Sequence, residues 1–349
     1  MLRSAATDVR RARFSAIDVH VHGKYKTRQS PEALDEWVRV MDDQNIAACV
    51  SLDGGLGEQL EEHKKYLWTR YRDRFVIFAN VDWQGAAAED LAAWDCQRPD
   101  FGRRMARSLR EARDQGATGL KVFKTLGLEH RNPDGSLLRI DDERWDPIWK
   151  ACGELGMPVL IHTADPAAFF LPVDRFNERW EELRRHPEWS YAAAGPALRE
   201  ELFAARNRVI RRHPGTTFIG AHMADSPEDL EQLASWLDAC PNLVVELSAR
   251  LAEIGRQPRA ARAFFLRYQD RILFGTDGPR PPERMRPHWR LLETEDEYFP
   301  YAEDQFPPQG MWRIYGLGLP DDALRKIYAE NAVRLIPGLA ERWDRWHAR

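Results

Sequence analysis

The sequence has little cysteine, no long apolar run and no large excess of either charge. Its four cysteines are too few and too scattered for a disulfide scaffold or a zinc knuckle, so we expect buried thiols at Cys49, Cys96, Cys152 and Cys240. No segment has the length of a membrane span or the apolar core of a signal peptide. The 51 Lys and Arg residues nearly balance 55 Asp and Glu, giving a formal charge of −4. This balance does not favour general binding to nucleic acid or to an anionic membrane.

These absences favour a cytoplasmic protein whose partner is a small molecule. At 349 residues with 43% hydrophobic content, the chain is long enough for one large α/β barrel or for two average domains. We expect a single domain over residues 1–349, in which residues 1–14 form an N-terminal extension.

Short apolar runs recur along the chain with helical patterns between them. Most of them begin about 30 residues apart, or somewhat further where insertions intervene, which is typical of repeated strand–helix units. Eight such units predict an α/β fold, a distorted (β/α)8 TIM barrel. The eight predicted strands begin near Ile17, Ile46, Phe75, Thr118, Pro158, Thr217, Leu243 and Ile272.

Two stretches are longer than such a barrel needs. Residues 164–208 follow the fifth predicted strand, and residues 278–318 follow the eighth. Both leave the carboxyl ends of strands, where the loops of these barrels build the active site, so we expect lids or pocket walls there. The alternative is that their aromatic residues only pack the extensions onto the barrel.

Two helical signals support the barrel. Ser30-Pro31 is a typical helix start, and the apolar residues that follow are spaced for one buried face. Near the C-terminus Asn331 falls on the apolar face of a predicted helix. We expect its amide to cap neighbouring backbone groups, because a buried amide must be hydrogen-bonded.

The run from Ile17 to Gly23 places two histidines two residues apart on a buried strand. Side chains alternate faces along a strand, so His20 and His22 point the same way. Two neutral imidazoles from one strand make half of a metal site. An isolated His-x-His remains a weak motif.

Polar residues also stand where three later strands end. His162 ends the fifth predicted strand, His222 the sixth and Asp277 the eighth. A single histidine at a strand end is more often structural, but the carboxyl ends of barrel strands meet at one mouth. Their convergence with His20 and His22 therefore predicts a functional site.

Together these motifs resemble the amidohydrolase superfamily, in particular its second family. That family includes metal-dependent hydrolases and decarboxylases similar to aminocarboxymuconate semialdehyde decarboxylase. The resemblance spans residues 15 to about 337 and implies a distorted TIM barrel with a metal at its carboxyl-end mouth. It is carried by residues 17–22, 158–162, 221–222, 275–278 and 328–335.

The resemblance implies that His20, His22, His162 and Asp277 bind one divalent metal, with zinc as the default and manganese or iron as alternatives. Imidazole and carboxylate donors suit all three metals. It also implies that Asp277 acts as a base besides binding the metal. His222 would be a general acid/base or would polarise a substrate oxygen, and in a two-metal variant it would be a ligand.

Lys121 on the fourth predicted strand separates these variants. In binuclear relatives a carbamylated lysine on this strand bridges two metals, and burial near cations would favour the reactive neutral amine. Three interpretations stay open: a carbamate bridge to a second metal, a cationic clamp for a substrate carboxylate, and a structural ion pair. Lys124 is a weaker candidate for the clamp. Arg280 is expected to contact an anion, because guanidinium pairs bidentately with carboxylates.

Asp18 is out of phase with the histidine pair, so we expect it to hydrogen-bond barrel backbone or to orient a ligand. Several other residues at strand ends are candidates for the pocket wall, with solvated or salt-bridged loop positions as the alternative. They are Asn80, Asp82, Glu246, Ser248 and Arg250.

These assignments predict a hydrolase in which a metal-activated water attacks a small cyclic or carboxylate-bearing ester, lactone or amide. One alternative is a metal-dependent non-oxidative decarboxylase of a small carboxylic acid. Another is a non-catalytic metabolite-binding barrel that has kept its metal site. Exposed aromatic extensions make a homodimer plausible.

Overall fold

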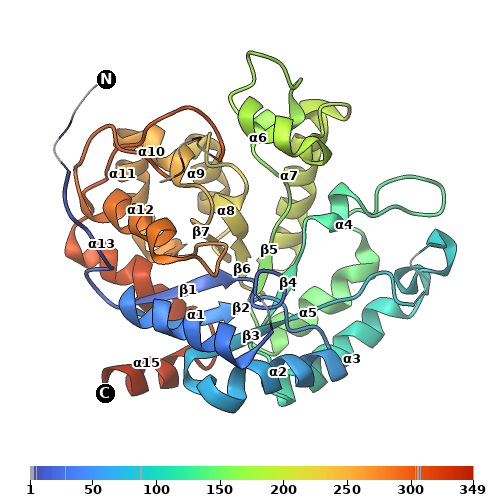
Figure 1. Ribbon diagram of the computed structural model, residues 1–349. Helices are drawn as coiled ribbons and strands as arrows, with labels where there is room; N and C mark the ends of the chain where they lie inside the picture. The colour runs from blue at the N-terminus through green and yellow to red at the C-terminus, as the bar shows by residue number, and fades with distance from the viewer. Residues whose placement is uncertain are drawn as a thin grey trace.

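The fold is a barrel of eight parallel strands that follow one another in chain order. The computed structural model describes residues 4, 6–27, 29–86, 89–302, 304, 306 and 308–348. Parts of the predicted extensions 1–14 and 278–318 therefore lie outside the described residues. Figure 1 shows the strands surrounded by helices. The strands are β1 (Ala16–Val21), β2 (Ile46–Ser51), β3 (Phe75–Asn80), β4 (Gly119–Val122), β5 (Val159–Ile161), β6 (Phe218–Gly220), β7 (Leu243–Glu246) and β8 (Ile272–Leu273).

Backbone hydrogen bonds between β1 and the segment after β8 close the barrel. The Val19 amide donates to the Phe274 carbonyl at 3.0 Å, and the Gly278 amide donates to the His20 carbonyl at 3.1 Å. The predicted TIM barrel is thus confirmed, and each predicted strand start lies within one residue of the observed one.

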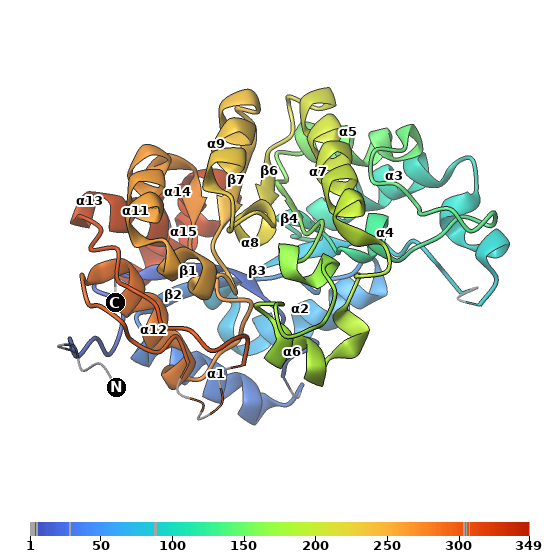
Figure 2. The same cartoon turned by 90° about the horizontal axis from the view of Figure 1, so that it is seen from above.

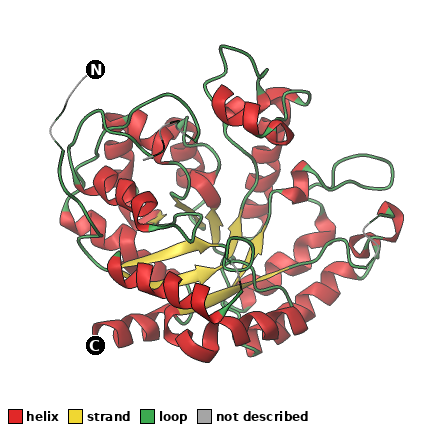
Figure 3. Cartoon of the chain, in the orientation of Figure 1, coloured by secondary structure: helices red, strands yellow, loops and turns green. Residues whose placement is uncertain are grey.

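Helices cover the outside of the barrel, as the colouring by secondary structure shows (Figure 3). A π-helical turn, Lys326–Glu330, joins α13 to α14. The helices are α1 (Pro31–Asp43), α2 (Glu58–Tyr71), α3 (Phe101–Asp114), α4 (Thr125–Leu128), α5 (Asp146–Glu154), α6 (Trp180–Arg185), α7 (Gly195–Arg212), α8 (Ala221–Ala224), α9 (Leu230–Ala239), α10 (Leu251–Arg256), α11 (Pro258–Arg267), α12 (Pro282–Glu293), α13 (Asp321–Arg325), α14 (Asn331–Leu335) and α15 (Leu339–His347).

Helix α1 forms where the sequence predicts a helix. The Ser30 hydroxyl accepts a hydrogen bond from the Ala33 amide at 3.2 Å, and Pro31 occupies the first helical position. Both features stabilise a helix N-terminus, where backbone amides have no partner within the helix. Its buried face is Leu34, Trp37, Val38, Val40 and Met41.

The segments after β5 and β8 carry their own helices. Residues 164–208 contain α6 and, from Gly195 onward, most of the long helix α7. Residues 278–318 contain α12, whose Trp289 is fully buried and stacks on Phe274 with ring centroids 4.7 Å apart. Seen from above, α6 and α12 lie toward the same side of the molecule (Figure 2).

Apolar residues of the strands pack against the C-terminal helices. One buried cluster joins Leu160, Ile219 and Val244 to Ala332 and Leu339. The C-terminal segment is therefore part of the barrel core. None of the helices in the described ranges is both long and apolar enough to cross a bilayer.

Asn331 caps backbone groups as expected. Its side-chain amide donates to the carbonyls of Gln269 at 2.7 Å and Ile272 at 2.9 Å. These bonds tie α14 to the start of β8.

We predict that Asn331→Ala lowers the free energy of unfolding by about 1–3 kcal/mol, because two buried carbonyls lose their donor. Urea denaturation followed by circular dichroism measures the effect. Glu330→Ala, an exposed position next to it, is the control and should change stability little. Equal losses in the two variants would contradict the capping role.

Candidate active site

Two histidines of β1 and an aspartate beyond β8 bring three ligand atoms together. His20 Nε2 and His22 Nε2 are 3.2 Å apart, as the strand alternation predicts. Asp277 Oδ1 lies 3.7 Å from the first nitrogen and 3.5 Å from the second. One imidazole nitrogen from each histidine and one carboxylate oxygen therefore surround a common point, as a divalent metal requires.

His162 lies beside His222. Its Nε2 is 2.9 Å from the Ala164 carbonyl and 3.6 Å from Asp225 Oδ1. Its ring centroid is 4.5 Å from that of His222. Among the described residues, two groups of candidate ligand atoms lie within 4.8 Å of one another, and His162 belongs to neither. Its role as a ligand stays a prediction.

A second group of donors adjoins the first. Ligand atoms of His20, His222 and Glu246 also lie within 4.8 Å of one another, and all three side chains are buried. The ring centroids of His20 and His222 are 4.8 Å apart. His20 belongs to both groups, so both candidate metal positions adjoin this residue.

Buried carboxylates orient the two histidines of β1. His22 Nδ1 is 2.7 Å from Asp53 Oδ1, and His20 Nδ1 is 2.9 Å from Glu246 Oε1. A carboxylate on Nδ1 holds the proton there and leaves Nε2 free to bind a metal. Asp53 was not predicted as a site residue, although it follows β2 as the other site residues follow their strands.

Burial lowers the pKa of three imidazoles of the site. Loss of hydration, followed by the charge of Lys121, holds the pKa of His20 well below its usual value. Burial also lowers the pKa of His162 and of His222 far below the usual value. For Asp277, burial raises the pKa of the carboxyl, but the surrounding imidazoles and Lys26 outweigh this and lower it. Neutral imidazoles and an ionised carboxylate are the forms that bind a metal.

His222 stands on a strained turn. The backbone is left-handed at four consecutive residues, with φ of 55° at His222, 60° at Met223, 51° at Ala224 and 58° at Asp225. This conformation is costly for residues with a Cβ and persists only where the surroundings enforce it. Nothing in the sequence predicts it, because none of the four is glycine.

Several contacts hold this turn. The His222 amide donates to Glu246 Oε1 at 2.7 Å, and Asp225 Oδ2 accepts the Thr163 amide at 2.9 Å. Two buried arginines of α7 also donate to it: Arg206 to the Ala224 carbonyl and Arg199 to the Asp225 carbonyl, each at 2.7 Å. The turn therefore has one arrangement, in which His222 Nδ1 lies 2.9 Å from the Ser248 carbonyl.

Lys121 is buried on β4 and has no hydrogen-bond partner for Nζ among the described residues. Nζ lies 5.3 Å from the centroid of the Phe123 ring. Burial lowers the pKa of its ammonium to about 8. The described residues place no carboxylate within ion-pair distance of Nζ, so the structural ion pair is not observed. The carbamate bridge and the substrate clamp stay predictions.

Two cations adjoin Asp277. Lys26 Nζ is 2.7 Å from Asp277 Oδ1 and donates to the Asp277 carbonyl at 2.7 Å. Arg280 Nη2 is 3.7 Å from Asp277 Oδ2. Lys26 was not predicted as a site residue. The residues around it in the sequence do not indicate that this loop lysine contacts Asp277, far along the chain.

Asp18 holds backbone next to the site, as expected. Its Oδ1 accepts the amides of His20 and Thr276, both at 3.1 Å. Its Oδ2 accepts the Thr276 hydroxyl at 2.5 Å. Asp18 therefore fixes β1 against the segment that carries Asp277.

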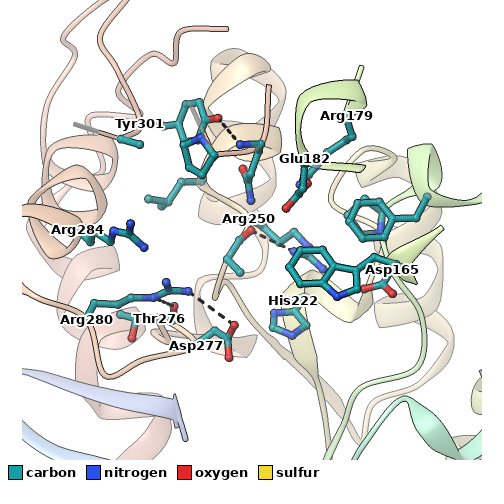
Figure 4. A pocket seen from close by; sticks show the side chains of 18 of the residues that line it. Asp165, Arg179, Glu182, His222, Arg250, Thr276, Asp277, Arg280, Arg284 and Tyr301 are labelled. Atoms are coloured by element: carbon teal, nitrogen blue, oxygen red, sulfur yellow. Dashed lines mark hydrogen bonds and ion pairs between the residues drawn. The ribbon is translucent and has the colours of Figure 1, made fainter. Parts of the chain in front are cut away.

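A cavity of about 500 Å³ opens above these residues. His162, His222 and Asp277 line it, and Figure 4 shows Asp277 between Arg280 and His222. The two extensions supply much of its wall, which supports their predicted role as pocket walls. The wall includes Phe169, Arg179, Trp189, Arg284 and Tyr301.

The donors fit a divalent metal. His20, His22 and Asp277 supply two imidazoles and one carboxylate, and His162, whose ring lies 4.5 Å from that of His222, stays the predicted fourth donor. Zinc, manganese and iron all accept this combination of donors.

We predict that Asp53→Asn weakens metal binding by about 10- to 100-fold, because the His22 ring loses its carboxylate partner. Titration of the protein against a chromophoric chelator measures this. Asp43→Asn, on the exposed end of α1, removes the same charge away from the site and should leave the affinity unchanged. An unchanged affinity in Asp53→Asn would exclude the orienting role.

Solved structures of other proteins share the fold. A 2,6-dihydroxybenzoate decarboxylase from Rhizobium superposes with a TM-score of 0.54 at 17% identity, over 92% of this chain and 98% of that one. A dihydroxybenzoic acid decarboxylase from Polaromonas, with bound manganese and the inhibitor 2-nitroresorcinol, gives 0.53 at 16% identity over 92% and 96%. A probable 2-pyrone-4,6-dicarboxylic acid hydrolase from Acinetobacter baumannii gives 0.50 at 12% identity over 92% and 99%.

At these identities the similarity shows the fold alone. The family is shown by the sequence: the profile of a family described as amidohydrolase matches residues 17–338, nearly the whole chain. The site at the carboxyl ends of the strands lies within the matched region, and members of the family are metal-dependent enzymes. The chain belongs to the amidohydrolase family.

Proposed function

We propose that this protein is a metal-dependent hydrolase of small esters, lactones or amides that carry a carboxylate. The observation that carries the proposal is the convergence of His20, His22 and Asp277 on one point below a cavity of small-molecule size. Family membership supports it. The cations of the wall, which include Arg280, support an anionic substrate.

His20, His22, His162 and Asp277 would hold the metal, with zinc proposed as its identity. Manganese is the alternative to zinc, because the Polaromonas decarboxylase structure contains bound manganese. A divalent metal in such a site lowers the pKa of water and polarises a carbonyl. If Lys121 is carbamylated, a second metal would lie near His222 and Glu246.

The proton transfers fall to Asp277 and His222. The Nδ1–H of His222 donates to the Ser248 carbonyl at 2.9 Å, which leaves Nε2 as a proton acceptor. Its lowered pKa keeps the imidazole neutral. Asp277 is ionised on the same cavity floor. Asp277 would take the proton of the attacking water, and His222 would relay a proton to the leaving group.

The substrate carboxylate would meet the cationic wall. Arg280 lines the cavity beside Asp277, with Nη2 3.7 Å from Oδ2. Lys121 is the second residue proposed to contact it, if it is not carbamylated.

A decarboxylase is the second candidate. The same cations could hold the carboxylate that leaves as carbon dioxide, and two of the structural neighbours are named decarboxylases. His222 would then take a proton from water at Nε2 and pass it to the carbon left behind.

We predict that the purified protein releases acid from a panel of lactones, esters and amides without forming carbon dioxide. A pH-stat for the lactones and esters, an amine assay for the amides and a coupled carbon dioxide assay for the panel extended with aromatic acids measure the products. Carbon dioxide release without ester, lactone or amide hydrolysis would replace the hydrolase by the decarboxylase.

We predict that His162→Ala loses metal and activity together, because a ligand is removed. His222→Ala should keep most of the metal and lose about 10²- to 10⁴-fold in turnover, the usual contribution of general acid–base catalysis. Elemental analysis after gel filtration and rates on the substrate found in the panel separate the two outcomes. His347→Ala, exposed on α15, serves as the control. A metal-free His222→Ala protein would overturn the mononuclear assignment.

A further inference from the structure

Arg250 is a buried arginine of the cavity wall that lacks a carboxylate partner. It follows β7 and is 6% exposed. Its Nη1 donates to the Ala249 carbonyl at 3.1 Å, while its buried Nε has no partner among the described residues. A guanidinium has five N–H donors, so most of them remain free. A buried charge without a counter-ion is costly, which makes such a residue unusual in a wall that serves only for packing.

Three other cations of the cavity are matched by acids at short range. Lys26 lies 2.7 Å from Asp277, and Lys124 lies 2.5 Å from Asp165. Arg179 is 2.6 Å from Glu182 and also contacts Glu253.

Two further cavity arginines have looser partners. Arg280 has a carboxylate oxygen of Asp277 at 3.7 Å, and Arg284 has one of Asp304 at 3.8 Å. Among the described Lys and Arg residues of the wall, Arg250 is thus the one that has no carboxylate oxygen within 4.0 Å of its side-chain nitrogens.

Two buried acids near Arg250 each contact other groups through one carboxylate oxygen. Glu253 and Asp225 both interact electrostatically with it. However, Glu253 is paired with Arg179 through Oε1, and Asp225 Oδ2 accepts the amides of Thr163 and Ala164. The other oxygen of each carboxylate has no hydrogen-bond partner among the described residues. Neither is within ion-pair distance of Arg250, so the guanidinium stays available to an anion from the cavity.

Arg250 stands beside the residues that would carry out the reaction. It lines the same cavity as His222 and Asp277, and its charge acts on His222. In Figure 4 it lies between the Arg179–Glu182 pair and His222. When the anionic group of a small molecule is bound to Arg250, the rest of that molecule would therefore reach the cavity floor.

We propose that Arg250 is the principal binding residue for the substrate carboxylate, ahead of Arg280 and Lys121. The assignment of this anion site to the substrate rests on the proposed function. The guanidinium fork matches a carboxylate with two parallel hydrogen bonds, and the bound anion supplies the counter-ion that the buried charge lacks. Substrates are therefore monoanions or dianions whose carboxylate is separate from the scissile carbonyl.

The test is calorimetric binding of small carboxylates to the metal-loaded protein. The probes are benzoate, phthalate and succinate, each compared with its neutral amide. Arg250→Met should weaken carboxylate binding by about 10- to 100-fold, the loss expected for charge-assisted hydrogen bonds, and should leave amide binding unchanged. Arg284→Met removes another cation of the same wall, half-exposed at the rim, and should change the affinity by less than about threefold.

A second variant guards against misfolding. Arg250→Lys keeps the charge but loses the planar fork, so its carboxylate affinity should fall between those of Arg250→Met and the unaltered protein. Thermal unfolding without added anion should show Arg250→Met at least as stable as the unaltered protein, because an unpaired buried charge is removed.

The outcomes separate this inference from the proposed function. Full carboxylate affinity in Arg250→Met, or no carboxylate binding by the unaltered protein, would overturn the assignment, while metal content and hydrolysis would still stand. Conversely, Arg250-dependent binding in a protein that hydrolyses nothing in the panel would support the anion site and reject the hydrolase.

Discussion

The carboxylate of Glu246 is the interaction on which the site depends. It is fully buried and accepts four hydrogen bonds: from His20 Nδ1 and the Ser248 hydroxyl at 2.9 Å, and from the amides of His222 and Ser248 at 2.7 Å. A buried carboxylate is tolerated only with such a complete set of donors. Glu246 thereby joins β1, β7 and the turn after β6, and it fixes the direction of His20 Nε2. Gly275 is needed beside it, because a Cβ at that position would lie 2.6 Å from Glu246 Oε2.

Local patterns predicted the parts of the molecule that are set by periodicity. The strand starts and α1 follow from alternating and helical spacing, and His20, His22 and Asp277 meet because parallel strands end at one mouth. The rest depends on contacts between distant segments. Asp53 and Lys26 acquire their roles only when their loops fold over the barrel, and the left-handed turn at His222 is imposed by Glu246, Asp225 and α7. The side-chain direction of His162 likewise depends on the loop after β5.

The floor and the walls of the cavity have separate origins. The floor is built from strand ends that the barrel brings together, so it reflects the family. The walls come from the extensions after β5 and β8 and from Arg250 after β7. Since fold does not determine specificity, we expect the choice between a hydrolase and a decarboxylase to depend on these walls.

Helix α7 connects the floor of the cavity to its wall. Its Arg199 donates to the carbonyl of Asp165, at the start of the extension after β5, at 3.1 Å and to the carbonyl of Asp225 at 2.7 Å. Protein engineers who wish to change the substrate range would naturally redesign this extension. Because its backbone is tied through Arg199 to the turn that carries His222, altering its length would disturb the position of His222 as well. Redesign should therefore exchange wall side chains such as Phe169 or Trp189 and leave the loop length and α7 as they are.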